Sequence, residues 1–205
     1  MMKKYLFVGA GALLLVACSG SAPETVSEAP AASSSSQKNQ DPNAWQVNVA
    51  DSALTFVATQ NDKEFEGTFS AFDADIVFDP ENLADASISV SIDMESATTG
   101  DRQRDSALPG NDWFKAKEFP RAQFTATSVT QTGPGQYEAV GLLAIRDITK
   151  EITLPFSLDI AGDTASADGS VTLIRTDFGV GQGEFTTGEW VGLEVMVGVQ
   201  IKATR

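Results

Sequence analysis

The stretch GDRQRDSALPGNDWFKAKEFPRAQFTAT, residues 100–127, interrupts a series of alternating apolar and polar segments. Its first part carries the signals of a short helix. Asp101 is placed to cap a helical turn that runs to Leu108. Pro109-Gly110 then stops that turn, because neither residue favours continuation of a helix.

The second part of the stretch carries another set of helix signals. Asn111 or Asp112 is placed to cap a turn that contains Trp113 and Phe114. Pro120 ends this turn, because a proline restricts the residue before it. We therefore expect a short helical lid insert, residues 100–120, between two β-strands.

Alternation of apolar and polar residues dominates the chain on both sides of the insert. In ASISVSIDM, residues 86–94, Ile88, Val90 and Ile92 share one face, a period of two that only a strand satisfies. The same pattern predicts strands at 45–49, 53–59, 64–71, 75–78, 86–94, 121–130, 136–146, 150–160, 165–174 and 191–203. No long helix is expected, so the fold class is all-β.

Turn signals separate several of these strands, at 133–135, 146–147 and 161–163. Asp147 is expected to take the left-handed conformation in its turn. The short connections predict an antiparallel up-and-down meander, and closure into a β-barrel would remove its exposed edges. A barrel of about eight strands is either filled by its own side chains or able to hold one small ligand, and the pattern leaves both possibilities open.

The N-terminal region predicts export and a lipid anchor. Residues 1–17, MMKKYLFVGAGALLLVA, have the basic start and short apolar run of a signal peptide. LVAC, residues 15–18, resembles the lipobox of bacterial lipoproteins, which implies acylation of Cys18 with palmitate or a similar chain. Ser19 then implies the periplasmic face of the outer membrane. Residues 18–43 predict a disordered tether, so the domain is expected at 44–205.

The composition excludes several kinds of chemistry. The 205 residues include no histidine and one cysteine, which excludes His-dependent triads, His-based zinc sites and intrachain disulfides. The net charge of −14 disfavours a nucleic-acid partner and favours a soluble monomer. The acidic run 163–168 lacks the oxygen spacing of a calcium loop, so we expect no metal and no cofactor.

Four segments in order resemble the YceI-like family. In the lid region the resemblance is carried by Arg104, Asp105, Leu108, Trp113, Phe114, Phe119, Pro120, Phe124 and Thr127. Similar segments occur at 67–83, 141–156 and 174–185, and the match spans about 45–203. The resemblance implies a lipocalin-like barrel whose elongated cavity holds a polyisoprenoid, an isoprenoid quinone or a similar amphiphilic lipid.

Apolar side chains are the candidate ligand contacts under this resemblance. They are Phe56, Phe69, Ile92, Leu108, Trp113, Phe114, Phe124, Leu143, Phe156 and Phe178. For the aromatic members, ordinary core packing is the alternative. Arg104 and Asp105 are candidates for a polar head group, because an Arg fork suits phosphate or quinone oxygens, with a surface ion pair as the alternative. Arg175 and Asp177 form either a second polar cluster or a pair that fixes the following turn.

Three functions agree with these features. The leading one is a non-catalytic lipid-binding protein with a hollow barrel. The second is an envelope assembly or stress-related interaction protein with a filled barrel, and the third is a small-barrel isomerase or hydrolase. Small residues in the apolar rows, among them Gly67 and Gly141, fit an elongated slot but also tight barrel corners.

Overall fold

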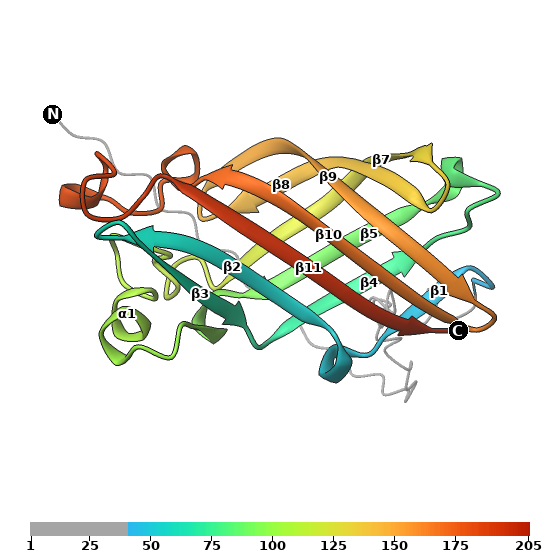
Figure 1. Ribbon diagram of the computed structural model, residues 1–205, viewed down its shortest axis with the longest axis horizontal. Helices are drawn as coiled ribbons and strands as arrows, with labels where there is room; N and C mark the ends of the chain where they lie inside the picture. The colour runs from blue at the N-terminus through green and yellow to red at the C-terminus, as the bar shows by residue number, and fades with distance from the viewer. Residues whose placement is uncertain (1–40) are drawn as a thin grey trace, which may run out of the picture. The chain divides into compact units, whose positions relative to one another are not determined.

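Eleven β-strand segments make up most of residues 41–205, the part of the chain that the computed structural model describes. They are β1 (Ala44–Val47), β2 (Ala53–Gln60), β3 (Lys63–Phe69), β4 (Phe72–Val77), β5 (Ser87–Asp93), β6 (Ala97–Thr98), β7 (Arg121–Gly133), β8 (Gln136–Ile145), β9 (Ile148–Ala161), β10 (Thr164–Ile174) and β11 (Glu194–Thr204) (Figure 1). The α-helix within residues 41–205 is α1 (Arg102–Ala107). Short 3-10 turns are η2 (Val49–Asp51), η3 (Leu83–Asp85), η4 (Met94–Ser96), η5 (Arg175–Phe178) and η6 (Gly183–Phe185).

Several predictions fall on residues that the structure does not describe. The signal peptide, Cys18 and the tether up to residue 40 lie outside the described part of the chain. Between residues 41 and 205, none of the helical segments has the length and apolar character needed to cross a bilayer.

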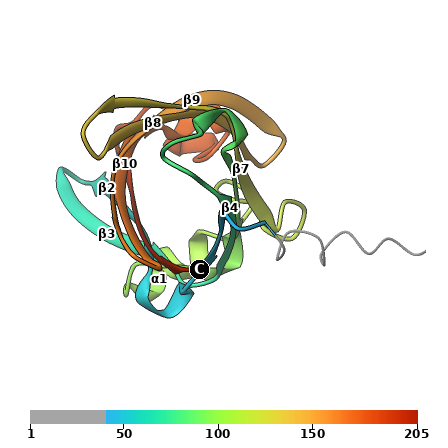
Figure 2. The same cartoon turned by 90° about the vertical axis from the view of Figure 1, so that its right-hand side faces the viewer.

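The strand order closes the sheet into a barrel. It runs β1-β4-β5-β7-β8-β9-β10-β11-β2-β3-β6, and β1 also pairs with β11. β1 and β2 are two parts of one interrupted strand, because both pair with the same edge of β11. In the same way β3 continues into β4, and β5 continues into β6. Counted as continuous strands, they form the expected antiparallel up-and-down barrel of eight strands, which Figure 2 shows from one end.

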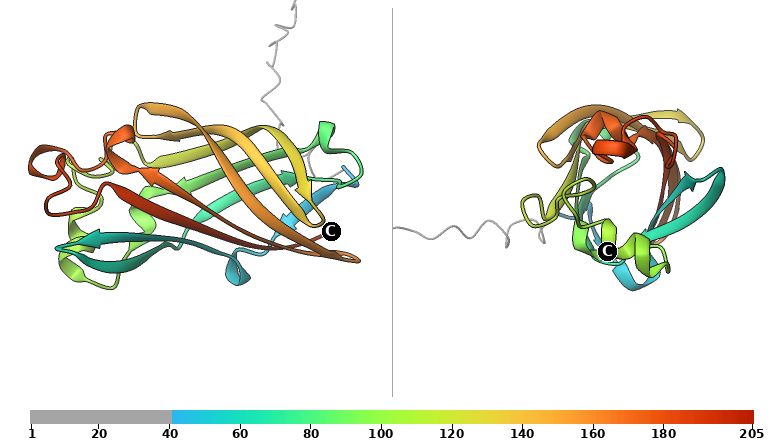
Figure 3. Two further views of the ribbon diagram at one scale, coloured as in Figure 1. Left: turned by 45° about the horizontal axis from the view of Figure 1, so that its top comes forward. Right: turned by 90° about the vertical axis from the view of Figure 1, so that its left-hand side faces the viewer.

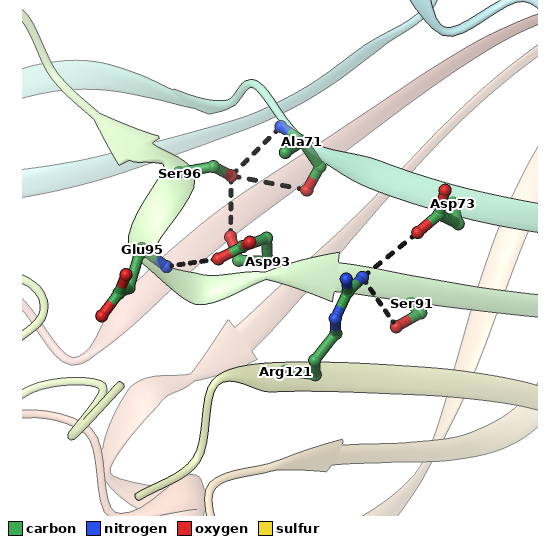
Figure 4. A network of polar contacts seen from close by, with 7 residues as sticks. All are labelled: Ala71, Asp73, Ser91, Asp93, Glu95, Ser96 and Arg121. Atoms are coloured by element: carbon green, nitrogen blue, oxygen red, sulfur yellow. Dashed lines mark hydrogen bonds and ion pairs between the residues drawn. The ribbon is translucent and has the colours of Figure 1, made fainter. Parts of the chain in front are cut away.

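A small polar network joins the β3–β4 strand to the β5–β6 strand at the place where the regular pairing of both is interrupted (Figure 4). The hydroxyl of Ser96 accepts a hydrogen bond from the backbone N–H of Ala71 at 3.1 Å and donates to the carbonyl of Asp93 at 2.7 Å. Nearby, Arg121 on β7 reaches across β5 to Asp73 on β4 at 3.2 Å. The two bonds of Ser96 satisfy backbone groups that regular pairing would otherwise bond.

The predicted turns are present, with one correction. Gly135 and Gly162 have positive φ angles of 66° and 63° in the turns after β7 and β9. Between β8 and β9, however, Arg146 has the positive φ, 57°, and Asp147 does not. Two-residue hairpin loops place a positive φ at their first position, and Arg146 holds that position. The expectation for Asp147 was therefore wrong by one residue.

The first part of the lid insert folds as predicted. The carboxylate of Asp101 caps α1 by accepting from the backbone N–H groups of Gln103 at 2.9 Å and Arg104 at 3.0 Å. The hydrogen bond from Arg104, followed by that from Gln103, lowers the pKa of Asp101. The helix ends at Ala107, directly before Leu108. The N-terminal signals of this turn are therefore sufficient to set its start.

The second part of the lid insert is not a helical turn, which corrects the prediction. Residues 109–119 form hydrogen-bonded turns, and Lys115 has a φ of 51°, which interrupts a right-handed helix. The carbonyl of Asp112 instead accepts from the backbone N–H groups of Gly181 and Gln182, both at 2.7 Å. Tertiary contacts to a distant loop therefore override the local capping signal.

Candidate functional site

One half of the barrel interior contains an apolar cavity of about 160 Å³, which we call the far chamber. A cluster of aromatic side chains contributes to its wall. The indole N–H of Trp45 donates to the carbonyl of Phe78 at 3.0 Å, and the ring of Phe78 lies 5.4 Å from that of Tyr137. Phe156 stacks on Tyr137 at 5.5 Å, and the guanidinium carbon of Arg205 lies 4.5 Å from the Trp45 ring.

The other half contains a second apolar cavity, of about 140 Å³, which we call the lid chamber. Aromatic rings also surround it. Phe56 lies 5.4 Å from Phe69, and Phe69 lies 5.9 Å from Phe114 of the lid insert. Trp113 and Phe178 complete the aromatic wall. α1 and the β10–β11 loop, residues 175–193, lie at this end of the barrel (Figure 3).

The interior is hollow. Several inward-facing side chains are only half-buried because they border these cavities, among them Ile92, Leu173 and Val197. A close-packed core would bury such side chains fully, so the barrel keeps internal space.

All ten predicted contact residues border one of the chambers. Phe124 and Phe156 line the far chamber, and Ile92 and Leu143 line both. The lid chamber contains the other six, namely Phe56, Phe69, Leu108, Trp113, Phe114 and Phe178. The structure thus brings the set together around the hollow interior, while contact of each residue with a ligand stays a prediction.

The small residues divide into two groups. Ala139, Ala165 and Ala167 line the far chamber, as an elongated slot requires. Gly67 and Gly141 do not line either chamber. A Cβ at Gly67 would overlap the ring of Phe56, and one at Gly141 would lie 2.6 Å from the ring of Phe124. These two glycines therefore make room for aromatic rings, and of the two alternatives the slot does not apply to them.

The lid insert is fastened to the β10–β11 loop. Arg146 donates to the carbonyl of Trp113 at 3.0 Å and to the carbonyl of Gly179. The ring of Trp113 packs on the ring of Phe185, with centroids 5.0 Å apart. The bonds from this loop to Asp112 add a third connection. The two segments therefore close the lid end as one unit.

Arg104 and Asp105 fix the other side of the lid insert. Asp105 accepts from the backbone N–H of Thr99 at 2.7 Å and from the hydroxyls of Thr99 and Thr98, each at 2.8 Å. These bonds, the backbone one first, lower the pKa of Asp105. Arg104 donates to Gln60 at 3.3 Å, with its guanidinium 4.4 Å from the Phe65 ring. Neither Arg104 nor Asp105 borders a chamber, so their contact with a head group stays a prediction.

Arg175 organises the β10–β11 loop and does not pair with Asp177. Arg175 is 5% exposed, and its guanidinium donates to carbonyls only, those of Val180, Gly181, Phe185, Val191 and Gly192. Burial lowers the pKa of Arg175. Asp177 pairs with Lys150 at 2.9 Å instead. The backbone N–H of Arg175 donates to the carbonyl of Leu193 at 2.9 Å, and β11 begins at Glu194 and not at residue 191 as predicted.

Sequence reasoning missed several residues that border the chambers. Trp45 and Phe78 line the far chamber, and Leu54, Leu173 and Val197 border both chambers. The alternation along the last strand does place Val197 on the inward face, so a signal for it is present. The pairing of Trp45 with Phe78 has no sequence signal, because 33 residues separate them. Within residues 41–205, no cluster of acidic or cysteine side chains is arranged to hold a metal ion.

Comparison with known proteins gives consistent results. A family model for the YceI-like domain matches residues 45–203. The crystal structure of BcnA from Burkholderia cenocepacia superposes with a TM-score of 0.75 at 32% identity, over 78% of this chain and 100% of that chain. A polyisoprenoid binding domain from Saccharophagus degradans, implicated in plant cell wall breakdown, superposes with a TM-score of 0.64. The two sequences are 12% identical, and the superposition covers 79% of this chain and 98% of that domain. This match therefore shows a shared fold.

Curated relatives match over part of their length. The UPF0312 protein plu2095 of Photorhabdus laumondii is 35% identical over 88 residues, which are 43% of this chain. The match covers 45% of that relative's own length. Protein YceI of Salmonella newport is 32% identical over 125 residues, and the match covers 65% of its length.

Proposed function

The chain belongs to the YceI-like family, and on that premise we propose that its barrel binds a long hydrophobic chain. The ligand class is a polyisoprenoid, an isoprenoid quinone or a similar amphiphile. The observation that carries this proposal is the hollow interior, with an apolar chamber in each half of the barrel. The related fold of the Saccharophagus degradans domain, a polyisoprenoid binding domain, supports the same ligand class.

The chemistry of the walls supports a hydrocarbon ligand. Every residue that lines the chambers is apolar or glycine, except Arg175. The N–H groups of Arg175 are engaged with backbone carbonyls of its own loop. Burial of a polar group without a partner is unfavourable, whereas each buried CH2 group contributes about 0.8 kcal/mol. We therefore place the hydrocarbon chain inside and the polar end of the ligand outside the chambers.

We propose a binding role without catalysis. Within the described residues, the chamber walls contain no carboxylate, amine, hydroxyl or thiol side chain that would act as an acid, base or nucleophile. The hollow interior also weighs against the alternative of a filled barrel with an assembly role. The acidic surface and closed sheet support a monomer.

The cellular location is part of the proposal. The lipobox at residues 15–18 and Ser19 support a protein that is attached through acylated Cys18 to the outer membrane, facing the periplasm. A location at the membrane would suit a protein that takes up and releases a membrane lipid.

Native extraction tests the ligand. We expect solvent extraction of the purified mature protein, followed by mass spectrometry, to release a lipid with a long prenyl or similar chain. Ala167→Phe, which fills the far chamber, should lose this lipid. Thr172→Phe is the matched control, because Thr172 lies on the same strand but is exposed and borders neither chamber. Absence of lipid from the wild type, together with no binding of added prenyl chains, would contradict the proposed function.

A further inference from the structure

Five aliphatic side chains border both chambers. They are Leu54, Ile92, Leu143, Leu173 and Val197. They belong to five different strands, β2, β5, β8, β10 and β11. Because these strands are distributed around the barrel, the five side chains form a layer across its interior. We call this layer the waist.

The waist divides the interior into two spaces of limited size. The far chamber is about 160 Å³ and the lid chamber about 140 Å³. An apolar cavity of about 150 Å³ accommodates a benzene-sized molecule. A short hydrocarbon therefore fits within one chamber, whereas a chain of many isoprene units is too large for either one.

We propose that the waist selects ligands by chain length. A short prenyl chain occupies either chamber alone, and a long chain passes the waist and occupies both. This inference rests on the proposed function and adds its specificity element. Ile92, Leu173 and Val197 are half-buried, so their side chains have room to change rotamer when a chain passes.

Two tryptophans report separately on the two chambers. Trp45 lines the far chamber and Trp113 lines the lid chamber. The third, Trp190, is 50% exposed and lines neither. Replacing Trp190 and one of the others by Phe leaves a single fluorescent reporter in a known chamber.

The experiment titrates both single-reporter proteins with a short prenyl alcohol, geraniol, and one of twice its chain length, geranylgeraniol. We expect each alcohol to change the emission of both reporters. Val197→Phe narrows the waist. It should weaken geranylgeraniol binding by at least about tenfold and remove the response of one reporter, while geraniol still affects both.

A matched variant tests whether the effect on binding is specific to the waist or follows from any loss of cavity volume. Val199 lies on the same strand and faces the same interior, but it lines the far chamber only. Val199→Phe should therefore reduce the response of Trp45 to geraniol, which Val197→Phe should leave intact. Leu173→Phe is a second narrowing variant, used if thermal melting shows that Val197→Phe does not fold.

The outcomes distinguish the two proposals. If the wild type binds both alcohols and the narrowed variants bind geranylgeraniol as the wild type does, the waist inference is wrong and the proposed function stands. If geraniol affects only one reporter in the wild type, two separately occupied chambers do not exist and the inference also fails. If the wild type binds neither alcohol, the proposed function itself fails.

Discussion

The ring of Trp113 lies 5.0 Å from the ring of Phe185, and this contact joins the lid insert to the β10–β11 loop. The two residues are far apart in the sequence, so closing the lid end depends on a tertiary contact. Arg146 strengthens the same connection through the carbonyls of Trp113 and Gly179. The lid insert and the β10–β11 loop therefore close the lid end together.

Trp113→Ala should open this end more than it destabilises the barrel. The eight strands keep their pairing, so we expect release of a fluorescent prenyl chain to accelerate more than unfolding in urea. Trp113 is half-buried, and the loss of stability should stay below the about 3–5 kcal/mol typical of a fully buried ring. Trp190→Ala, at an exposed position, is the control. An unchanged release rate beside a large loss of stability would show that Trp113 serves only the core.

Gly67→Ala should destabilise the barrel by about 1–3 kcal/mol, because the added Cβ overlaps the ring of Phe56. The measurement is the free energy of unfolding in urea. Gly133→Ala is the matched control, since a Cβ there meets no atom closer than 3.7 Å. Equal stability of the two variants would contradict the assigned role of Gly67.

Arg175→Lys should destabilise the β10–β11 loop although it keeps the positive charge. A lysine cannot reproduce the planar fork that serves five carbonyls, and each buried carbonyl left without a partner costs about 1–3 kcal/mol. We expect faster hydrogen exchange across residues 179–193 and lower stability in urea. Arg121→Lys is the control, because its ion pair with Asp73 is exposed and worth about 0–1 kcal/mol. Unchanged hydrogen exchange in Arg175→Lys would contradict the role of Arg175 in holding the β10–β11 loop.

Asp105 should make the attachment of α1 depend on pH. Its hydrogen bonds to Thr99 and Thr98 lower the pKa of the folded state below that of the unfolded state. Its stabilising contribution is therefore complete above the unfolded pKa of about 3.9 and is lost as the pH falls through the lowered value.

Asp105→Asn removes this titration. We expect the difference in unfolding midpoint between wild type and variant to shrink as the pH falls from neutral to about 3. Asp159→Asn, at an exposed position on β9, is the control. A difference that is constant with pH would contradict the role of the charged form.

Cys18→Ser tests the anchor. We expect the variant to remain unlabelled by radioactive palmitate and to leave the outer-membrane fraction, while the barrel unfolds at the wild-type midpoint. The barrel's core is built from residues 45–203, which explains the unchanged midpoint. Palmitate labelling of the variant would disprove the lipoprotein interpretation.

The sequence alone determined the class and order of the elements. The period of two along β5, β7 and β11 predicts strands whose apolar faces point inward, because only a strand alternates its side chains. The capping residue Asp101 and the Pro109-Gly110 stop determine α1 locally. The resemblance across four segments indicated the ligand class and the residues that border the interior.

Only the tertiary structure decided how the interior and the lid end are arranged. Gly67 and Phe56 meet across two paired strands, and Asp112 bonds to Gly181 over a long stretch of chain. Whether a barrel is hollow depends on how the side chains of all its strands fill one shared volume. Periodicity assigns each side chain to a face but does not describe that volume. Long-range packing and hydrogen bonding therefore settled the two chambers, the course of residues 109–119 and the position of Arg175.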